Sequence, residues 1–394
     1  MFKENFHEKT TLILSLLIMN NYFLLSVGLS NLILKINLIF FFFFIFFYYL
    51  KNFKENIFLK IFFILFILIS IGTPAVEWDP RSIWLFQAKR IFFDNSIYSI
   101  ADNYFNIHYD YPSLAPSLAS TFAMTFGIWN EVLPKLAFLF MFLPPLILLY
   151  VFFHNTSYII FLYIVFFFIG KYLFTGWMDG LVAMYFSISS FLMYIIVIKD
   201  NSIYKNNYLL SSIAFVFFTI LTLLKNEGFV LLLLLFFTTA ILQLSKNQLK
   251  ENFFKLFIFS LSFLPIIFWK IFCYTKGIGN THVNLDILTN FIPRLYEFEN
   301  YKMISYFLFL NEKFLIALVF FLISFWLSKN IQLLNFVVIN AILYTLVLFF
   351  MFLSTPLDLY FQLNSTAARV IKTLSFLLAF FGLYNLTLSR LKGL

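Results

Sequence analysis

Long apolar stretches alternate with short polar ones along the whole chain. An apolar run of roughly 20 residues is the length that crosses the hydrocarbon core of a bilayer as an α-helix. We therefore predict an all-α polytopic membrane protein, a single domain over 1–394 with a bundle of about 11–13 transmembrane helices. The predicted spans are 11–30, 33–50, 57–74, 133–153, 158–176, 180–198, 208–224, 228–244, 253–273, 314–328, 331–353 and 371–389.

The composition excludes the common classes of soluble protein. Hydrophobic residues make up 62% of the chain and charged residues 11%, and the mean hydropathy is +0.92. The 11 glycines form no phosphate-binding loop, which argues against a nucleotide-binding domain, and the single Cys273 excludes an intramolecular disulfide. The net charge of +9 does not indicate a nucleic-acid partner, because the basic residues are spread over short loops.

Basic residues predict the orientation of the spans. Lysines follow several of them, and short loops rich in lysine and arginine stay on the cytoplasmic side. This orientation places the remaining polar segments together on the external face. They are loop 75–115, Trp177–Gly180, Lys225–Gly228, 274–300 and 354–369.

Segment 112–128 does not fit a simple count of crossings. Loop 75–115 and Asp179 are both predicted to be external, so an even number of crossings must separate them, yet three apolar segments do. Either 112–128 lies in the interface or re-enters, or the region 133–176 contains an additional short, broken helix. Pro144 and Pro145 favour a break, since proline removes a helical hydrogen bond.

Loop 75–115 contains the densest polar chemistry of the chain. Glu77 and Asp79 are one residue apart, beside a span, where a carboxylate can act as a general base on an acceptor hydroxyl. The alternative is that Asp79 only caps a helix beginning at Pro80, while Glu77 is a solvated loop residue. That helix is predicted to lie in the plane of the interface, with Trp84 among the headgroups.

Cations near the external ends of spans are a second set of candidates. Arg81, Lys89, Lys225 and Arg369 can each neutralise a lipid phosphate, or can simply extend toward lipid headgroups. The run from Lys225 to Glu227 is either part of a site or a tight hairpin in which Gly228 makes the turn. Asp179 is explained by its place at a helix N-terminus.

The remaining candidates lie in loops. His108, Asp110 and Tyr111 precede Pro112, and Asp358 follows Thr355 and Pro356. A lone histidine in such a loop is more often structural than a ligand, and the four histidines show no zinc-like spacing. The segment with Asp358 can be a capped external loop. Glu77 and Asp79 suit a divalent cation, although two carboxylates are too few to define a metal site, so no cofactor is specified.

These motifs together resemble the C-type (GT-C) glycosyltransferases, and within them the protein O-mannosyltransferase and aminoarabinose transferase type. The resemblance rests on Glu77-Trp78-Asp79, the following Arg81–Trp84 and Ala88-Lys89, Asp110-Tyr111-Pro112, and the tail from Thr355 to Arg369. It implies a multi-span enzyme that uses polyprenyl-phosphate sugars. It also implies a bacterial inner (plasma) membrane location, with an active site that faces the periplasm.

The resemblance also implies roles for residues and regions. Asp79, and after it Glu77, would deprotonate or position the acceptor. The substrate- or phosphate-binding candidates are Arg81, Lys89, His108, Asp110, Tyr111, Lys225, Glu227, Asp358 and Arg369. The predicted regions are an extra N-terminal hairpin (1–56), a catalytic-type module (57–273), an external loop (274–300) and C-terminal helices (301–394).

The predicted partners are a polyprenyl-phosphate-linked sugar, a lipid or glycan acceptor and membrane lipids. A protein acceptor is less favoured, because no large external domain is expected beyond Arg369. Two other functions stay open. One is an O-antigen-type polymerase or ligase, in which the largest external loop usually comes late in the chain. The other is a lipid or small-molecule transporter, although the chain shows no internal repeat.

Overall fold

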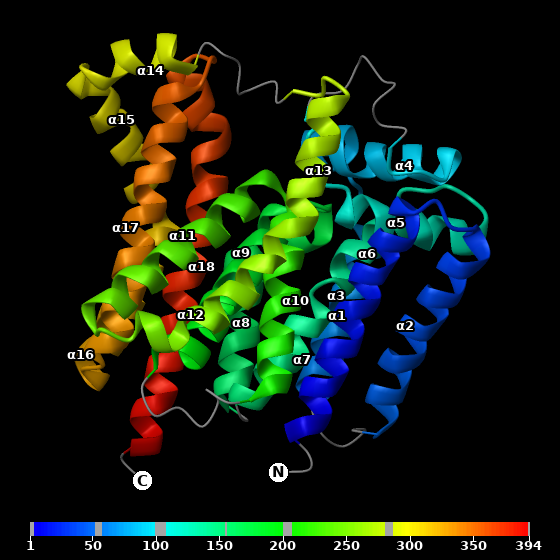
Figure 1. The fold of residues 1–394 in the computed structure, drawn as a ribbon, viewed down its shortest axis with the longest axis horizontal. Helices are drawn as coiled ribbons and strands as arrows, with labels where there is room; N and C mark the ends of the chain where they lie inside the picture. Colours follow the sequence, from blue (N-terminus) through cyan, green and yellow to red (C-terminus); the bar gives the residue numbers. More distant parts are fainter. Residues whose placement is uncertain are drawn as a thin grey trace.

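The computed structural model describes residues 4–51, 57–98, 108–153, 156–199, 207–279 and 287–392. These residues form helices and connecting loops, and none of them is in a β-strand (Figure 1). Within them, eight helices are long and apolar enough to cross a membrane, or nine if a pair bent by 72° (Phe298–Phe309 and Glu312–Ser328) counts as one span. The prediction of an all-α polytopic membrane protein is therefore confirmed.

The helices follow the predicted apolar segments closely. In chain order they are α1 (Glu4–Ser26), α2 (Asn31–Lys51), α3 (Ile57–Gly72), η1 (Pro80–Trp84), α4 (Leu85–Asp94), α5 (Leu114–Phe126), α6 (Val132–Phe140), α7 (Leu143–Phe152), α8 (Thr156–Thr175), α9 (Asp179–Met193), η3 (Tyr194–Ile198), α10 (Tyr208–Leu224), α11 (Asn226–Ser245), α12 (Leu249–Ser260), η4 (Leu261–Phe263), α13 (Leu264–Thr275), α14 (Ile287–Leu295), α15 (Phe298–Phe309), α16 (Glu312–Ser328), α17 (Ile331–Ser354) and α18 (Leu359–Lys392).

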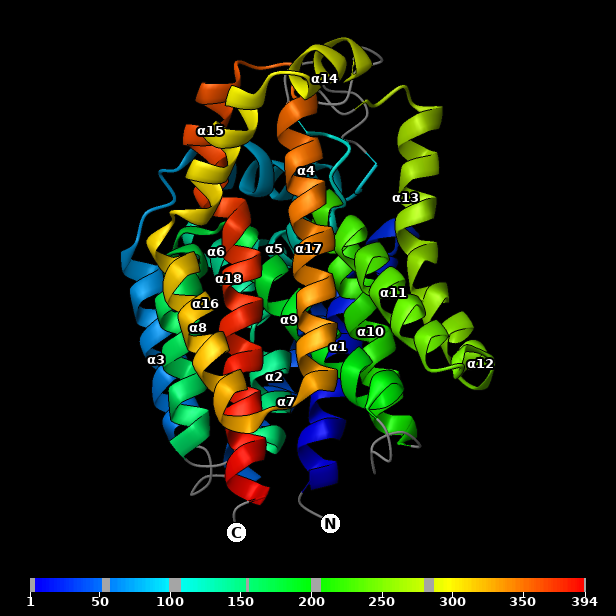
Figure 2. The ribbon, with the colours of Figure 1, turned by 90° about the vertical axis from the view of Figure 1, so that its left-hand side faces the viewer.

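The bundle has two distinct ends. Helix α1 begins and α18 finishes at the same end, drawn at the bottom in Figures 1 and 2. The opposite end, called here the upper end, carries α4 and α14, which lie across the long helices (Figure 1). The described parts of the segments that the sequence predicts to share one face lie toward this upper end, where ion pairs and hydrogen bonds connect them.

Helix α5 explains the uneven count of crossings. The residues before and after it both contact the layer formed by η1 and α4. Before α5, the ring of Tyr111 stacks on Trp84 at 5.4 Å, and after it, the ring of Trp129 lies 5.9 Å from that of Phe92. A helix of 13 residues is also too short to span the hydrocarbon. Segment 112–128 therefore stays near the upper end, and only α6–α7 and α8 separate loop 75–115 from Asp179. The predicted break is present too, since α7 begins just before Pro144.

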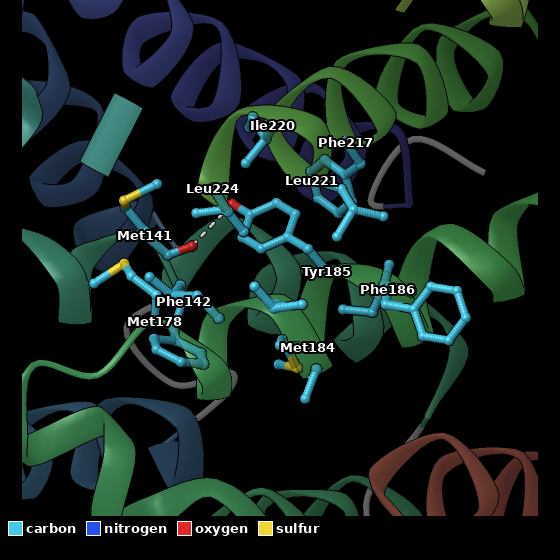
Figure 3. Close-up of a cluster of buried hydrophobic side chains, with 14 of the residues drawn as sticks. Met141, Phe142, Met178, Met184, Tyr185, Phe186, Phe217, Ile220, Leu221 and Leu224 are labelled. Atoms are coloured by element: carbon cyan, nitrogen blue, oxygen red, sulfur yellow. Dashed lines mark hydrogen bonds between the residues drawn. The ribbon is translucent and has the colours of Figure 1, made fainter. Parts of the chain in front are cut away.

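Helix α9 is the centre of the bundle, and its packing positions the polar groups above it. The span from Asp179 to Ile198 is wholly buried. In Figure 3 Tyr185 extends from α9 toward α10, and its ring lies 5.2 Å from that of Phe217 on α10. Its hydroxyl donates a hydrogen bond to the carbonyl of Met141, between α6 and α7 (2.9 Å). This packing fixes α9 against α10, so the first residue of α9 lies close to the last residue of α10.

The connection between α10 and α11 differs from the prediction. Only Lys225 lies between the two helices, in an extended conformation, and Gly228 belongs to the first turn of α11. The turn is therefore not made by the glycine. Gly228 is required by close packing instead, because a Cβ atom there would lie 1.9 Å from the carbonyl oxygen of Leu221.

We expect Gly228→Ala to lower the free energy of unfolding by about 1–3 kcal/mol or more, since the added methyl group forces α10 and α11 apart. Thermal unfolding of the purified protein in detergent measures the change. Gly72→Ala is the matched control, because a Cβ at Gly72 meets nothing within 4 Å. An equal unfolding midpoint for the two variants contradicts the prediction.

Candidate functional site

Five charged side chains form one connected group at the upper end, which we name the charged cluster. Arg369 Nη2 lies 2.6 Å from Asp79 Oδ2, and Arg369 Nε lies 3.4 Å from Asp179 Oδ2. Lys225 Nζ lies 3.1 Å from Asp179 Oδ1 and 2.9 Å from Glu227 Oε1. Asp179 thus joins the two cations, and the cluster connects the first large loop with α9, α11 and α18.

The charged cluster is mostly removed from solvent. Asp79, Asp179 and Lys225 are buried, whereas the side chains of Arg369 and Glu227 are 19% and 35% exposed. Charges in such surroundings need partners of opposite sign. Three carboxylates and two cations give a formal charge of −1, so both cations are already compensated within the cluster.

Asp79 directly precedes η1, as predicted, but its side chain does not cap the helix. The helical turn already includes it, and its side chain makes no capping hydrogen bond but extends to Arg369. The alternative in which Asp79 is only a helix cap is therefore wrong. Burial raises the pKa of Asp79 above its ordinary 3.8, although the charges of Arg369 and Lys225 act in the opposite direction.

Two further features stabilise the cations. The guanidinium of Arg369 lies over the ring of Trp177, 4.0 Å from the centroid, which is the geometry of a cation–π contact. Burial disfavours the charge of Lys225, but Asp179 and Glu227 outweigh it and raise the pKa of the lysine. Lys225 therefore keeps its charge, and its amine is held between two acids.

A second polar group lies beside the charged cluster and is centred on Asp110. Its Oδ2 accepts hydrogen bonds from Asn226 (2.6 Å) and Lys270 (2.9 Å), and its backbone oxygen accepts one from the indole of Trp269 (3.0 Å). Asn226 follows Lys225 directly in the chain. The Asp110 group therefore attaches the loop before α5 to both α11 and α13.

Tyr111 connects the Asp110 group to the charged cluster. Its ring stacks on His108 at 4.8 Å and on Trp84 at 5.4 Å, and the amine of Lys225 lies 5.8 Å from its centroid. His108 adopts a positive φ of 72°, which is uncommon for a residue with a side chain. Because Tyr111 is buried and already stacks on two rings, it supports the site and does not present a free stacking surface.

The other predicted residues lie apart from these groups. Glu77 pairs with Lys171 at the surface (3.3 Å). Arg81 and Lys89 are exposed and take part in none of the ion pairs formed by the described residues. Asp358 is exposed and caps α18, because its Oδ1 accepts the N–H of Phe361 (2.8 Å). The capped-loop interpretation of that segment agrees with this geometry.

Several residues of the site carry no individual signal in the sequence. Asp179 was sufficiently explained by a helix N-terminus, yet it pairs with both cations of the charged cluster. Trp177 and Asn226 are predicted only as members of the polar segments Trp177–Gly180 and Lys225–Glu227, and Lys270 falls inside the predicted span 253–273. The available signal was the polar segment Trp177–Gly180 on the same predicted face as loop 75–115, which indicates proximity to the site but not the pairing.

The carboxylates of the site do not converge as metal ligands. Glu77 and Asp79 have different partners, Lys171 and Arg369. Over the part of the chain that the structure describes, no group of three or more histidine, cysteine, aspartate or glutamate side chains is arranged to hold a metal ion.

Comparisons of the chain with models of protein families, with curated proteins and with solved structures found no match.

Proposed function

We propose that this protein is an integral membrane glycosyltransferase of the GT-C type. It would move a sugar from a polyprenyl-phosphate donor to a lipid or glycan acceptor. The observation that carries the proposal is the position of Asp79. A carboxylate from the first large loop is buried in a charged cluster at the end of the bundle where the polar segments meet.

Asp79 is the proposed general base. Arg369 binds one of its oxygens, whereas the other, Oδ1, makes no hydrogen bond among the described residues, and 12% of the side chain is exposed. A pKa raised by burial makes a carboxylate a stronger base. Asp79 takes the proton of the acceptor hydroxyl while that oxygen attacks the anomeric carbon. The bond from this carbon to the phosphate oxygen breaks, polyprenyl phosphate leaves, and the anomer is inverted.

The neighbouring residues act as positioning groups in this proposal. Arg369 fixes the orientation of Asp79 and is itself fixed by Trp177 and Asp179. Lys225 and Glu227 complete the charge balance. The loop before α5 is held against α11 and α13 by Asp110, and within it His108 stacks on Tyr111. These contacts keep Lys225 beside the loop that carries Asp79.

The upper end is proposed to face the exterior, which for a bacterial inner membrane is the periplasm. Lysines that follow spans at the opposite end, Lys51, Lys199 and Lys329, support this orientation. Labelling with a membrane-impermeant thiol reagent tests it. In a Cys273→Ser background, Lys89→Cys should react from outside intact cells, and reaction only after lysis contradicts the orientation.

Turnover is the direct test of the proposed function. The purified protein in lipid is incubated with a panel of polyprenyl-phosphate and polyprenyl-diphosphate sugars, and release of the lipid carrier is followed. We expect release of polyprenyl phosphate with at least one monophosphate donor. Release from diphosphate-linked glycans alone indicates the polymerase or ligase alternative. Solute uptake into proteoliposomes without release of any carrier indicates a transporter.

The pH dependence of the rate gives an independent check on Asp79. A general base must be deprotonated, so the rate rises with pH through the pKa of Asp79. Because burial raises this pKa, the acid limb of kcat/KM should lie above pH 3.8. Arg369 opposes the shift, so Arg369→Gln should move the limb to still higher pH. An acid limb that does not move in this variant contradicts the assignment.

A further inference from the structure

The charged cluster leaves one requirement of the proposed function unmet. A donor phosphate needs cations that are not already neutralised. Lys225 lies between Asp179 and Glu227, and Arg369 lies between Asp79 and Asp179. These two residues hold the carboxylates in place, so the phosphate must meet other positive charges.

Three lysines from three helices gather along residues 167–172 of α8. Lys171 belongs to α8 itself. Lys313 extends from α16, where its amine donates a hydrogen bond to the carbonyl of Phe167 (2.5 Å) and lies 4.9 Å from the ring centroid. Lys372 extends from α18, where its amine is hydrogen-bonded to the hydroxyl of Tyr172 and lies 3.7 Å from that ring centroid.

Both inner amines contact the same stretch of α8, between Phe167 and Tyr172. Phe167 and Tyr172 are five positions apart on α8, which corresponds to about 7.5 Å along the axis.

Neither inner amine has an acidic partner. Among the described residues, the ion pairs of this region are Lys171 with Glu77 and those of the charged cluster, and Lys313 and Lys372 belong to none of them. Asp179, the nearest acid of the charged cluster along this face, is already bound by Lys225 and Arg369 and forms no ion pair with Lys372 among the described residues. Two half-buried ammonium groups held on neutral acceptors are costly unless an anion binds between them.

We propose that Lys313 and Lys372 form an anion-binding subsite, with Lys171 at its rim, that takes the phosphate of a lipid-linked substrate. Helices α8 and α16 also carry exposed apolar side chains next to the lysines, Phe166 and Ile316, which suit a hydrocarbon tail. Arg369 and Lys372 lie three residues apart on α18. A phosphate bound to Lys372 is therefore about one helical turn from Arg369, which binds Asp79. The identity of the lipid rests on the proposed function, whereas the anion site does not.

Binding of polyprenyl phosphate, measured by native mass spectrometry on the full chain in detergent without acceptor, tests the subsite. Lys313→Gln and Lys372→Gln should each weaken binding by about tenfold or more, because each removes a charge-assisted contact. Lys313→Arg with Lys372→Arg should retain it. Lys302→Gln is the matched control, since Lys302 is exposed on α15 and pairs with Glu299. Unchanged affinity in both glutamine variants overturns the proposal.

The wild-type protein provides a second measurement that does not depend on whether variants fold. Polyprenyl phosphate should protect Lys313 and Lys372, but not Lys302, from an amine-reactive reagent, as read by mass spectrometry. Equal protection by the neutral polyprenol overturns the proposal, because the phosphate then contributes nothing. Protection by phosphatidylglycerol or inorganic phosphate at equal concentration shows a general phosphate site, which overturns the lipid-linked substrate as its ligand. Since no sugar is transferred, failure here is distinct from failure of the transferase assay.

Discussion

Asp79→Asn is expected to lower the rate of sugar transfer by about 10²–10⁴-fold, the contribution of a well-placed general base. Asparagine has the same shape and can still accept a hydrogen bond from Arg369, so the loop and the bundle stay folded. The loss should therefore appear in kcat, with little change in the thermal unfolding midpoint. Release of polyprenyl phosphate in the donor panel measures the rate.

Asp94→Asn is the control for this substitution. Asp94 lies on α4 of the same loop, and its one ion pair among the described residues is with Arg90, at 3.1 Å and partly exposed. Its replacement tests whether loss of any loop carboxylate lowers the rate. Near wild-type turnover in Asp79→Asn, or an equal loss in Asp94→Asn, removes the assignment of Asp79 as base.

Asp179→Asn is expected to have the largest effect on stability, about 3–5 kcal/mol, the range for removing one partner of a buried ion pair. Asp179 is the only carboxylate of the charged cluster bound to both Lys225 and Arg369. Without its charge, the two cations face each other across a buried space with less compensation. The free energy of unfolding in lipid bicelles, obtained by steric trapping, measures the change.

Two comparisons make this result specific. Asp358→Asn should change the free energy of unfolding by less than about 0.5 kcal/mol, since the residue is exposed and asparagine also caps helices well. Adding Lys225→Met to Asp179→Asn should restore part of the loss, because the charge left without its partner is removed as well. A loss no larger than that of Asp358→Asn contradicts the central place given to Asp179.

The site could be predicted from the sequence only in part. Asp79, Lys225, Glu227 and Arg369 were selected as polar residues beside spans, and they do come together. Arg81, Lys89 and Asp358 met the same criterion and lie elsewhere, because position beside a span is shared by every residue of an interface. Asp179 has no distinguishing signal in the sequence, because its place at a helix N-terminus already accounts for a carboxylate there.

The sequence by itself determined the class of fold and the grouping of polar segments at one end. Transfer of an apolar segment into a bilayer depends on the composition of that segment alone, so each helix is specified locally. Only the tertiary structure decided which charges compensate one another. Asp79 and Arg369 are 290 positions apart, and their ion pair exists because the packing of α9, α10 and α18 brings the two side chains to 2.6 Å. Electrostatic interaction depends on distance in space, and the order of residues along the chain does not contain that distance.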